Sequence, residues 1–190
     1  MMFRAHPATS IMLLAAPVLV GGVLASAAAP AFAAQYLSIE QAQRTLYPEA
    51  TRFQDTSLQL NNEQMRQVEK LSGLPARSVS WRVFAAYKDS QLLGHVILDD
   101  VIGKVELISY AVAVAPDGAV QQIEILAYRE SHGFEIRNPA WRRQFVGKNV
   151  QAGLKVGDGI ANISGATLSC THVTDGVRRI AAIAQVALKT

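Results

Sequence analysis

The loop at residues 163–169 carries the side chains best suited to chemistry in this sequence. It reads I-S-G-A-T-L-S and stands directly before a predicted helix. Its glycine lets the backbone approach a ligand closely. The first N–H groups of a helix have no partner inside the helix, and the helix dipole places partial positive charge there, so this loop suits a phosphate. The same residues also fit an ordinary helix cap, and both interpretations stay open at this point.

Patterns for other kinds of site are missing from the sequence. It contains no P-loop, no G-x-G-x-x-G, no C-x-x-C and no H-E-x-x-H. Three histidines lack the mutual spacing of metal ligands, so we predict no metal site: His95, His132 and His172. Adjacent charged pairs are interpreted as solvent-facing: Asp99-Asp100, Arg142-Arg143 and Arg178-Arg179. The lone Cys170 is interpreted as a small buried hydrophobic residue.

Alternating and helical patterns surround the loop with a sheet and a final helix. Strands are predicted at residues 53–60, 79–87, 92–98, 105–114 and 120–128. Helices are predicted from Ser38 to about Tyr47, from Asn61 to Gly73, as a short segment over 139–145, and from about Ser169 to Leu188. The turn at 116–118, Pro-Asp-Gly, makes the pairing antiparallel. This order predicts an α+β fold, a twisted antiparallel sheet with helices at both chain ends.

Residues 1–33 have the pattern of a secretory signal peptide. Arg4 precedes an apolar stretch, and Ala31-Phe32-Ala33 forms an A-x-A cleavage site. Cleavage after Ala33 leaves residues 34–190 as one domain that is exported from the cytoplasm. The alternative is an uncleaved segment that anchors the chain in the inner membrane, because the apolar stretch is long enough to span a bilayer.

The composition excludes several classes of protein. With 190 residues, of which 50% are hydrophobic and 17% charged, the chain is neither disordered, collagen-like nor a coiled coil. One cysteine cannot form an internal disulfide. The formal net charge of +3 is spread along the chain, so nucleic acid is not an expected partner.

Three segments together resemble the FMN-binding domain of periplasmic subunits of Na⁺-translocating NADH:quinone reductases, of Rnf-type complexes and of small exported flavoproteins. Residues 164–169 are similar to its S/T-G-A-T/S motif, and residues 128–134 to its E-T-P-G segment. Residues 141–147, W-R-R-Q-F-V-G, resemble its W-x-x-x-F-x-G stretch. The resemblance covers about residues 94–180. One departure stands at Ala161, where the family usually has an acidic residue.

The resemblance implies a covalent flavoprotein that carries electrons rather than a free-standing enzyme. FMN would be joined to Thr167 by a phosphoester. The surrounding loop would be formed by Ser164, Gly165, Ala166, Leu168 and Ser169, and the ring would lie near Glu130, Ser131, His132 and Gly133. The implied partners are an FMN transferase that uses FAD, and a membrane flavocytochrome, haem protein or ferric-reductase-like subunit. The alternative function is a non-redox periplasmic binding module that keeps the fold without flavin.

Overall fold

The fold is described from a computed structural model of the chain, which describes residues 1–2, 34–130 and 132–188. The predicted signal peptide at residues 1–33 therefore lies outside the described residues, except for its first two positions. Ser131 of the predicted site also lies outside them. Within the described part of the chain, no helix is long and apolar enough to cross a membrane.

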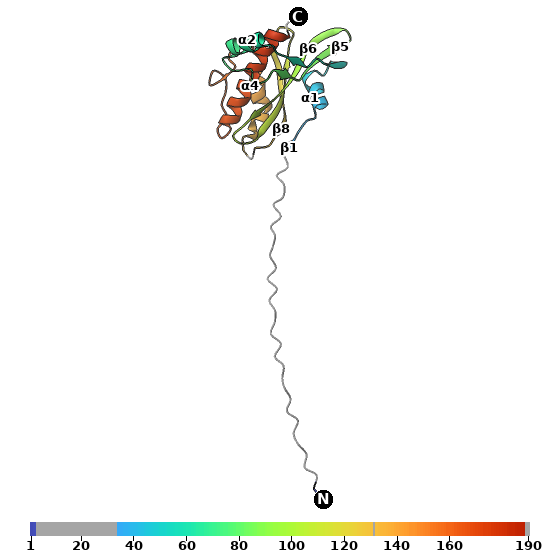
Figure 1. The fold of residues 1–190 in the computed structure, drawn as a ribbon, viewed down its shortest axis with the longest axis vertical. Helices are drawn as coiled ribbons and strands as arrows, with labels where there is room; N and C mark the ends of the chain where they lie inside the picture. Colours follow the sequence, from blue (N-terminus) through green and yellow to red (C-terminus); the bar gives the residue numbers. More distant parts are fainter. Residues whose placement is uncertain (3–33, 131, 189–190) are drawn as a thin grey trace. The chain divides into compact units, whose positions relative to one another are not determined.

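A six-stranded sheet forms the centre of the domain (Figure 1), with the strand order β1-β8-β7-β6-β5-β2 and every pairing antiparallel. Its strands are β1 (Ala34–Gln35), β2 (Arg52–Asp55), β5 (Val83–Lys88), β6 (Gln91–Ile102), β7 (Leu107–Val114) and β8 (Val120–Tyr128). The predicted antiparallel sheet and α+β fold are confirmed.

The predicted strand at residues 53–60 is two short strands. Asp55 ends β2 because its carboxylate accepts a hydrogen bond from the Ser57 backbone N–H at 2.9 Å, which turns the chain. The next strand, β3 (Leu58–Gln59), pairs with β4 (Ser80–Trp81) outside the main sheet. A further pair, β9 (Lys155–Val156) and β10 (Gly159–Ile160), is parallel and precedes the 163–169 loop.

The helices cover the sheet on two sides (Figure 1). Their bounds are α1 (Ile39–Leu46), α2 (Asn62–Ser72), α3 (Pro139–Arg142) and α4 (Thr167–Ala187), with short 3₁₀ turns at Phe134–Arg137 and Arg143–Phe145. Helices α2 and α4 pack into the larger apolar core on one face of the sheet, which we call the α4 face. Helix α1 packs on the opposite face, the α1 face, where its Ala42 and Leu46 meet side chains of β5–β8.

Close contact with the sheet fixes the position of α4. A Cβ atom at Gly176 would lie 1.7 Å from the Tyr110 hydroxyl oxygen, so only glycine allows this approach. The Tyr110 hydroxyl in turn donates a hydrogen bond to the Asp99 carboxylate at 2.5 Å. Helix α4 is buried along most of its length, and its N-terminus is held at one end of the sheet.

Three predictions about charged pairs are wrong. Asp99 lies within β6, and its carboxylate accepts a hydrogen bond from the buried Tyr110 hydroxyl instead of facing solvent. Arg142 forms an ion pair with Glu124, and both side chains are largely buried. Arg179 is 5% exposed, and its Nε donates a hydrogen bond to the Pro75 carbonyl at 2.7 Å. Since neighbouring residues of a helix point in different directions, one member of each arginine pair faces the protein. Cys170 is buried, as predicted.

Candidate functional site

The N-terminus of α4 is exposed and lacks a side-chain cap. The N-cap position is Ala166, which has no hydroxyl or carboxylate to offer, and no described side chain accepts a hydrogen bond there. Ser164, Gly165 and Thr167 are exposed around it. The first N–H groups of this long helix therefore face an open surface, which is the arrangement that binds phosphate in many proteins.

The turn before α4 depends on Gly165. Its φ of +84° lies in the left-handed region, which favours glycine, and the Ala166 N–H closes the turn on the Ile163 carbonyl at 3.0 Å. No described atom lies within 4 Å of the position that a Cβ at Gly165 would occupy. The turn thus presents bare backbone to the surface beside Thr167.

A hydrogen bond fixes the side chain of Thr167, the first residue of α4. The Asn162 side-chain amide donates a hydrogen bond to the Thr167 Oγ1 atom at 3.0 Å, which leaves the hydroxyl proton of Thr167 uncommitted in this contact. Ala161, where the resemblance shows a departure, has an exposed side chain but a fixed backbone. Its N–H donates to Gln144 Oε1 and its carbonyl accepts from Trp141 Nε1, both at 2.8 Å.

The structure brings the second sequence segment, residues 128–134, against the first. Gly133 has a φ of +89°, and a Cβ atom there would lie 3.2 Å from the Ala166 Cβ and 2.5 Å from the Tyr128 hydroxyl oxygen. That hydroxyl donates to the His132 carbonyl, and its oxygen lies 3.0 Å from the Ser169 Oγ atom. Tyr128 is a site residue that sequence reasoning missed, since it ends β8 with the pattern of an ordinary core strand.

Glu130 ties a third segment, the β6–β7 loop, to this site. Its Oε1 atom accepts hydrogen bonds from the backbone N–H groups of Val105 at 2.5 Å and Glu106 at 2.9 Å. Partial burial raises the pKa of Glu130, but these backbone hydrogen bonds outweigh it and hold the pKa below its ordinary value. Glu130 was predicted to lie near the flavin ring, and the structure shows its carboxylate occupied by the loop.

His172 connects the same loop to α4. Its Nδ1 atom lies 2.6 Å from the Ile102 carbonyl oxygen and 3.0 Å from that of Gly103, so Nδ1 carries a proton and donates. His132, in contrast, has an exposed side chain. In the ranges that the structure describes, no group of three or more metal-ligating side chains is found.

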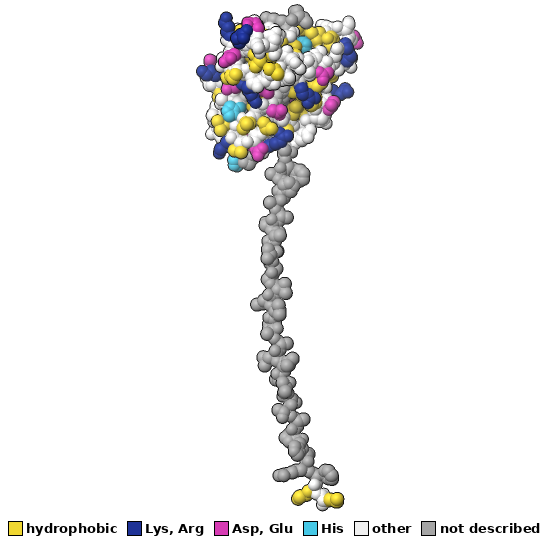
Figure 2. Space-filling view, viewed as in Figure 1, with side chains coloured by type: hydrophobic (Ala, Val, Ile, Leu, Met, Phe, Trp, Pro, Cys, Tyr) yellow, Lys and Arg dark blue, Asp and Glu magenta, His cyan; other side chains and the backbone are white. Residues whose placement is uncertain are grey.

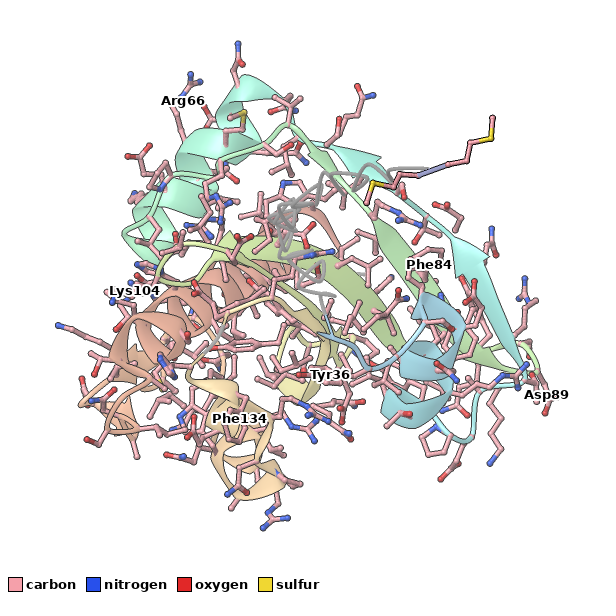
Figure 3. The ribbon with its side chains drawn as sticks, turned by 90° about the horizontal axis from the view of Figure 1, so that it is seen from below. Tyr36, Arg66, Phe84, Asp89, Lys104 and Phe134 are labelled. Atoms are coloured by element: carbon pink, nitrogen blue, oxygen red, sulfur yellow. The ribbon has the colours of Figure 1, made fainter. Side chains whose placement is uncertain are left out.

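Exposed apolar side chains surround the loop that begins α4. Leu168 is 45% exposed, Phe134 57% and Val105 70%, and each stands on one of the three connected segments. Figure 3 shows Phe134 and Lys104, beside Val105, on the same side of the domain as α4. Elsewhere on the face seen in Figure 2, charged side chains of both signs are interspersed. Apolar groups beside an uncapped helix N-terminus, which suits a phosphate, also suit a flat aromatic ring, so the residues present fit FMN.

A family model matches the part of the chain that contains this site. Residues 103–182 match the model of the FMN-binding domain family, so the chain contains an FMN-binding domain and its cofactor is FMN. Among solved structures, the crystal structure of NqrC from Shewanella oneidensis is similar, with 17% sequence identity and a TM-score of 0.46; the match covers 73% of this chain and 80% of that chain. No curated protein matches the chain.

Proposed function

We propose that this protein is an exported electron carrier whose FMN is joined to Thr167 by a phosphoester. The observation that carries the proposal is the uncapped N-terminus of α4, where an exposed threonine hydroxyl and unpartnered helix N–H groups meet at one surface. A phosphate there would accept hydrogen bonds from the first turn of α4 and would be stabilised by the helix dipole. Residues 34–190 would form the mature domain.

The attachment reaction that this site would support is a phosphoryl transfer. The Thr167 oxygen would form a bond to the FMN phosphorus of FAD, the bond between the two phosphates would break, and AMP would leave while the threonine proton goes to a base on the transferase. Asn162 donates to the same oxygen and orients it. A covalent bond retains the cofactor in the periplasm, where no steady supply of soluble flavin exists.

The segments around the loop would bind and orient the ring. FMN supplies reversible electron transfer when bound, and its surroundings set the potential. Leu168, Phe134 and Val105 offer apolar contacts, and Glu130 and His172 keep the β6–β7 loop in place beside them. Electrons would pass to or from a membrane redox partner, such as a flavocytochrome, a haem protein or a ferric-reductase-like subunit.

The central experiment is intact mass measurement of the chain exported from a host that contains an FMN transferase. We expect a chain that begins at Ala34, carries the added mass of FMN minus water and fluoresces on a denaturing gel. The Thr167→Ala variant should lose both signals completely, whereas Thr171→Ala, one turn along α4, should keep them. Equal fluorescence in Thr167→Ala would place the bond elsewhere, and a chain that never takes up flavin would favour a non-redox binding module.

The departure at Ala161 offers a second test of attachment. Because the Ala161 side chain is exposed and its backbone is fixed, Ala161→Asp adds a carboxylate without disturbing the loop. If the transferase recognises an acidic side chain at position 161, a larger fraction of Ala161→Asp than of the parent chain should carry FMN when the amount of transferase is limiting. The flavin spectrum of the finished protein should be the same in both. Equal modification would show that the acid is dispensable.

A further inference from the structure

A cleft opens on the α1 face of the sheet, across the sheet from α4. Its volume is about 490 Å³. Its floor is formed by Leu98, Ser109 and Leu126 of three neighbouring strands, and the N-terminal end of α1 borders it at Ile39. Helix α1 covers the adjoining part of this face, and Trp81 and Arg82 also line the cleft.

Exposed apolar side chains continue the floor beyond the cleft. Ile102 and Leu107 are cross-strand partners near the tip of the β6–β7 hairpin, and they are 57% and 43% exposed. Side chains alternate along a strand, so Ile102 points to the same side as Leu98. At about 3.3 Å per residue, the four steps between them span about 13 Å. This length suits an extended ligand or a helix better than a small molecule.

Three arginines stand at the rim of the cleft, and all are exposed: Arg77, Arg82 and Arg129. Among the described residues, none of the three forms an ion pair. Arg77 donates to the Asp100 carbonyl at 3.1 Å, and the Arg82 guanidinium carbon lies 5.8 Å from the centre of the Phe84 ring. Of the two carboxylates that line the cleft, that of Asp99 accepts the Tyr110 hydroxyl and only Asp100 is exposed. Backbone hydrogen bonds lower the pKa values of Glu40 and Asp55, and both lie close enough to Arg82 for its positive charge to lower them further, but neither forms an ion pair with it.

Helix α1 shows which chemistry this face accepts. It buries Ala42 and Leu46 against the sheet and carries an exposed carboxylate, Glu40, in its first turn. A backbone N–H and the Ser38 hydroxyl lower the pKa of Glu40, and the positive charge of Arg82 lowers it further. Helix α1 is therefore an example of a helix that packs apolar side chains on this face and keeps a carboxylate beside Arg82.

We propose that the cleft, together with Ile102 and Leu107, docks an acidic amphipathic helix of a partner protein. Apolar side chains of the helix would fill the floor, and its carboxylates would meet Arg82 and Arg129. The concave shape favours a helix over a flat lipid surface. The hairpin that carries Ile102 and Leu107 also carries the loop bound by Glu130, so a docked partner would lie beside the FMN-binding site. The docking cleft itself does not depend on bound flavin.

The test uses the exported, flavin-loaded chain and a fluorescent designed peptide of about 16 residues. The peptide places leucines on one helical face with glutamates beside them, and its control has glutamine for every glutamate. We expect the acidic peptide to bind at least tenfold more tightly than the control. The Arg82→Glu/Arg129→Glu double variant should weaken binding at least tenfold, and Ile102→Asp should weaken it too. Arg66→Glu, on α2, should stay within twofold of the parent.

Further measurements separate this proposal from its rivals. NMR shifts on peptide binding should concentrate at Leu98, Ser109 and Ile102; shifts at Phe134 and Leu168 alone would overturn the proposal. Equal binding of both peptides, or unchanged binding by the double variant, would also overturn it. Two further results would overturn it: a dimer seen in sedimentation, or binding to anionic lipid vesicles, if the Arg82→Glu/Arg129→Glu double variant abolishes that association but leaves the affinity for the peptide unchanged. The Thr167→Ala chain should bind like the parent, so failure of flavin attachment leaves this test intact.

Discussion

Helices α2 and α4 begin in opposite ways. At the N-terminus of α2, Asn61 accepts a hydrogen bond from the Gln64 backbone N–H, and the Gln64 side chain accepts one from the Asn61 N–H, both at 2.9 Å. At the N-terminus of α4, Ala166 offers no acceptor, and its ψ of 20° differs from the 170° of Asn61. The shorter helix is thus capped by its own sequence, while the longer helix leaves its first N–H groups to the surface.

The difference shows where each helix obtains its stability. Only a few residues of α2 are buried, so a cap worth about 1 kcal/mol matters to it. Helix α4 is buried along most of its length against the sheet and α2, and this burial offsets the missing cap. A helix held by its core can leave its end free for a ligand.

The largest effect is expected at Gly133, which holds the 128–134 segment against the open end of α4. Gly133→Ala forces a left-handed backbone on a residue with a Cβ and places that atom 2.5 Å from the Tyr128 hydroxyl oxygen. We expect a loss of about 2–4 kcal/mol in the free energy of unfolding, measured with urea. The matched control is Gly165→Ala, with similar φ but open space, which should lose only about 1–2 kcal/mol. Equal losses would contradict this packing.

Free FMN should stabilise the chain made without the transferase. At a hundred times its Kd, a ligand that binds only the folded state adds about 2.7 kcal/mol, or about 5–10 °C in Tm for a domain of this size. Riboflavin, which lacks the phosphate, should give less than half of this shift if the N-terminus of α4 binds the phosphate. Identical shifts for FMN and riboflavin would show that the open helix end contributes nothing.

Removal of the α2 cap should affect stability and leave flavin untouched. Asn61→Ala removes the acceptor for the Gln64 N–H and should lower the free energy of unfolding by about 1 kcal/mol. The fraction of chain that carries FMN, read by intact mass, should equal that of the parent. If Asn61→Ala lost flavin in proportion to its loss of stability, the N-termini of α2 and α4 would be coupled, and the two helix ends would not be independent.

The smallest expected effect is the response of the Glu130 hydrogen bonds to acid pH. The pKa of Glu130 is lower in the folded chain than its ordinary value of 4.5. The ionised carboxylate therefore stabilises the fold above pH 4.5, and this stabilisation is lost as the pH falls through the pKa of the folded chain. The amide NMR signals of Val105 and Glu106 should therefore shift with a midpoint below 4.5. In Glu130→Gln, which keeps an acceptor oxygen, this transition should disappear. A midpoint at or above 4.5 would contradict the observed hydrogen bonds.

Local patterns in the sequence predicted most of the secondary structure. The hairpin turn at residues 116–118, both capping boxes and the start of α4 within two residues follow from short-range rules that hold whatever the rest of the chain does. The strand at 53–60 was misjudged because a single side-chain hydrogen bond at Asp55 interrupts it. The buried sides of Arg142 and Arg179 also escaped prediction, since they depend on partners far along the chain.

The sequence by itself determined the loop before α4, its glycine and its threonine, because a helix start is a local matter. The absence of a capping side chain became clear only when the structure placed Ala166 at the N-cap. Only the tertiary structure decided that Tyr128, Gly133 and the β6–β7 loop meet there, since strands β6, β7 and β8 must pair before their ends come together. It also decided that α1 leaves a cleft open on its face of the sheet. Which surfaces remain free depends on how helices of fixed length pack on a sheet, and no local pattern records that.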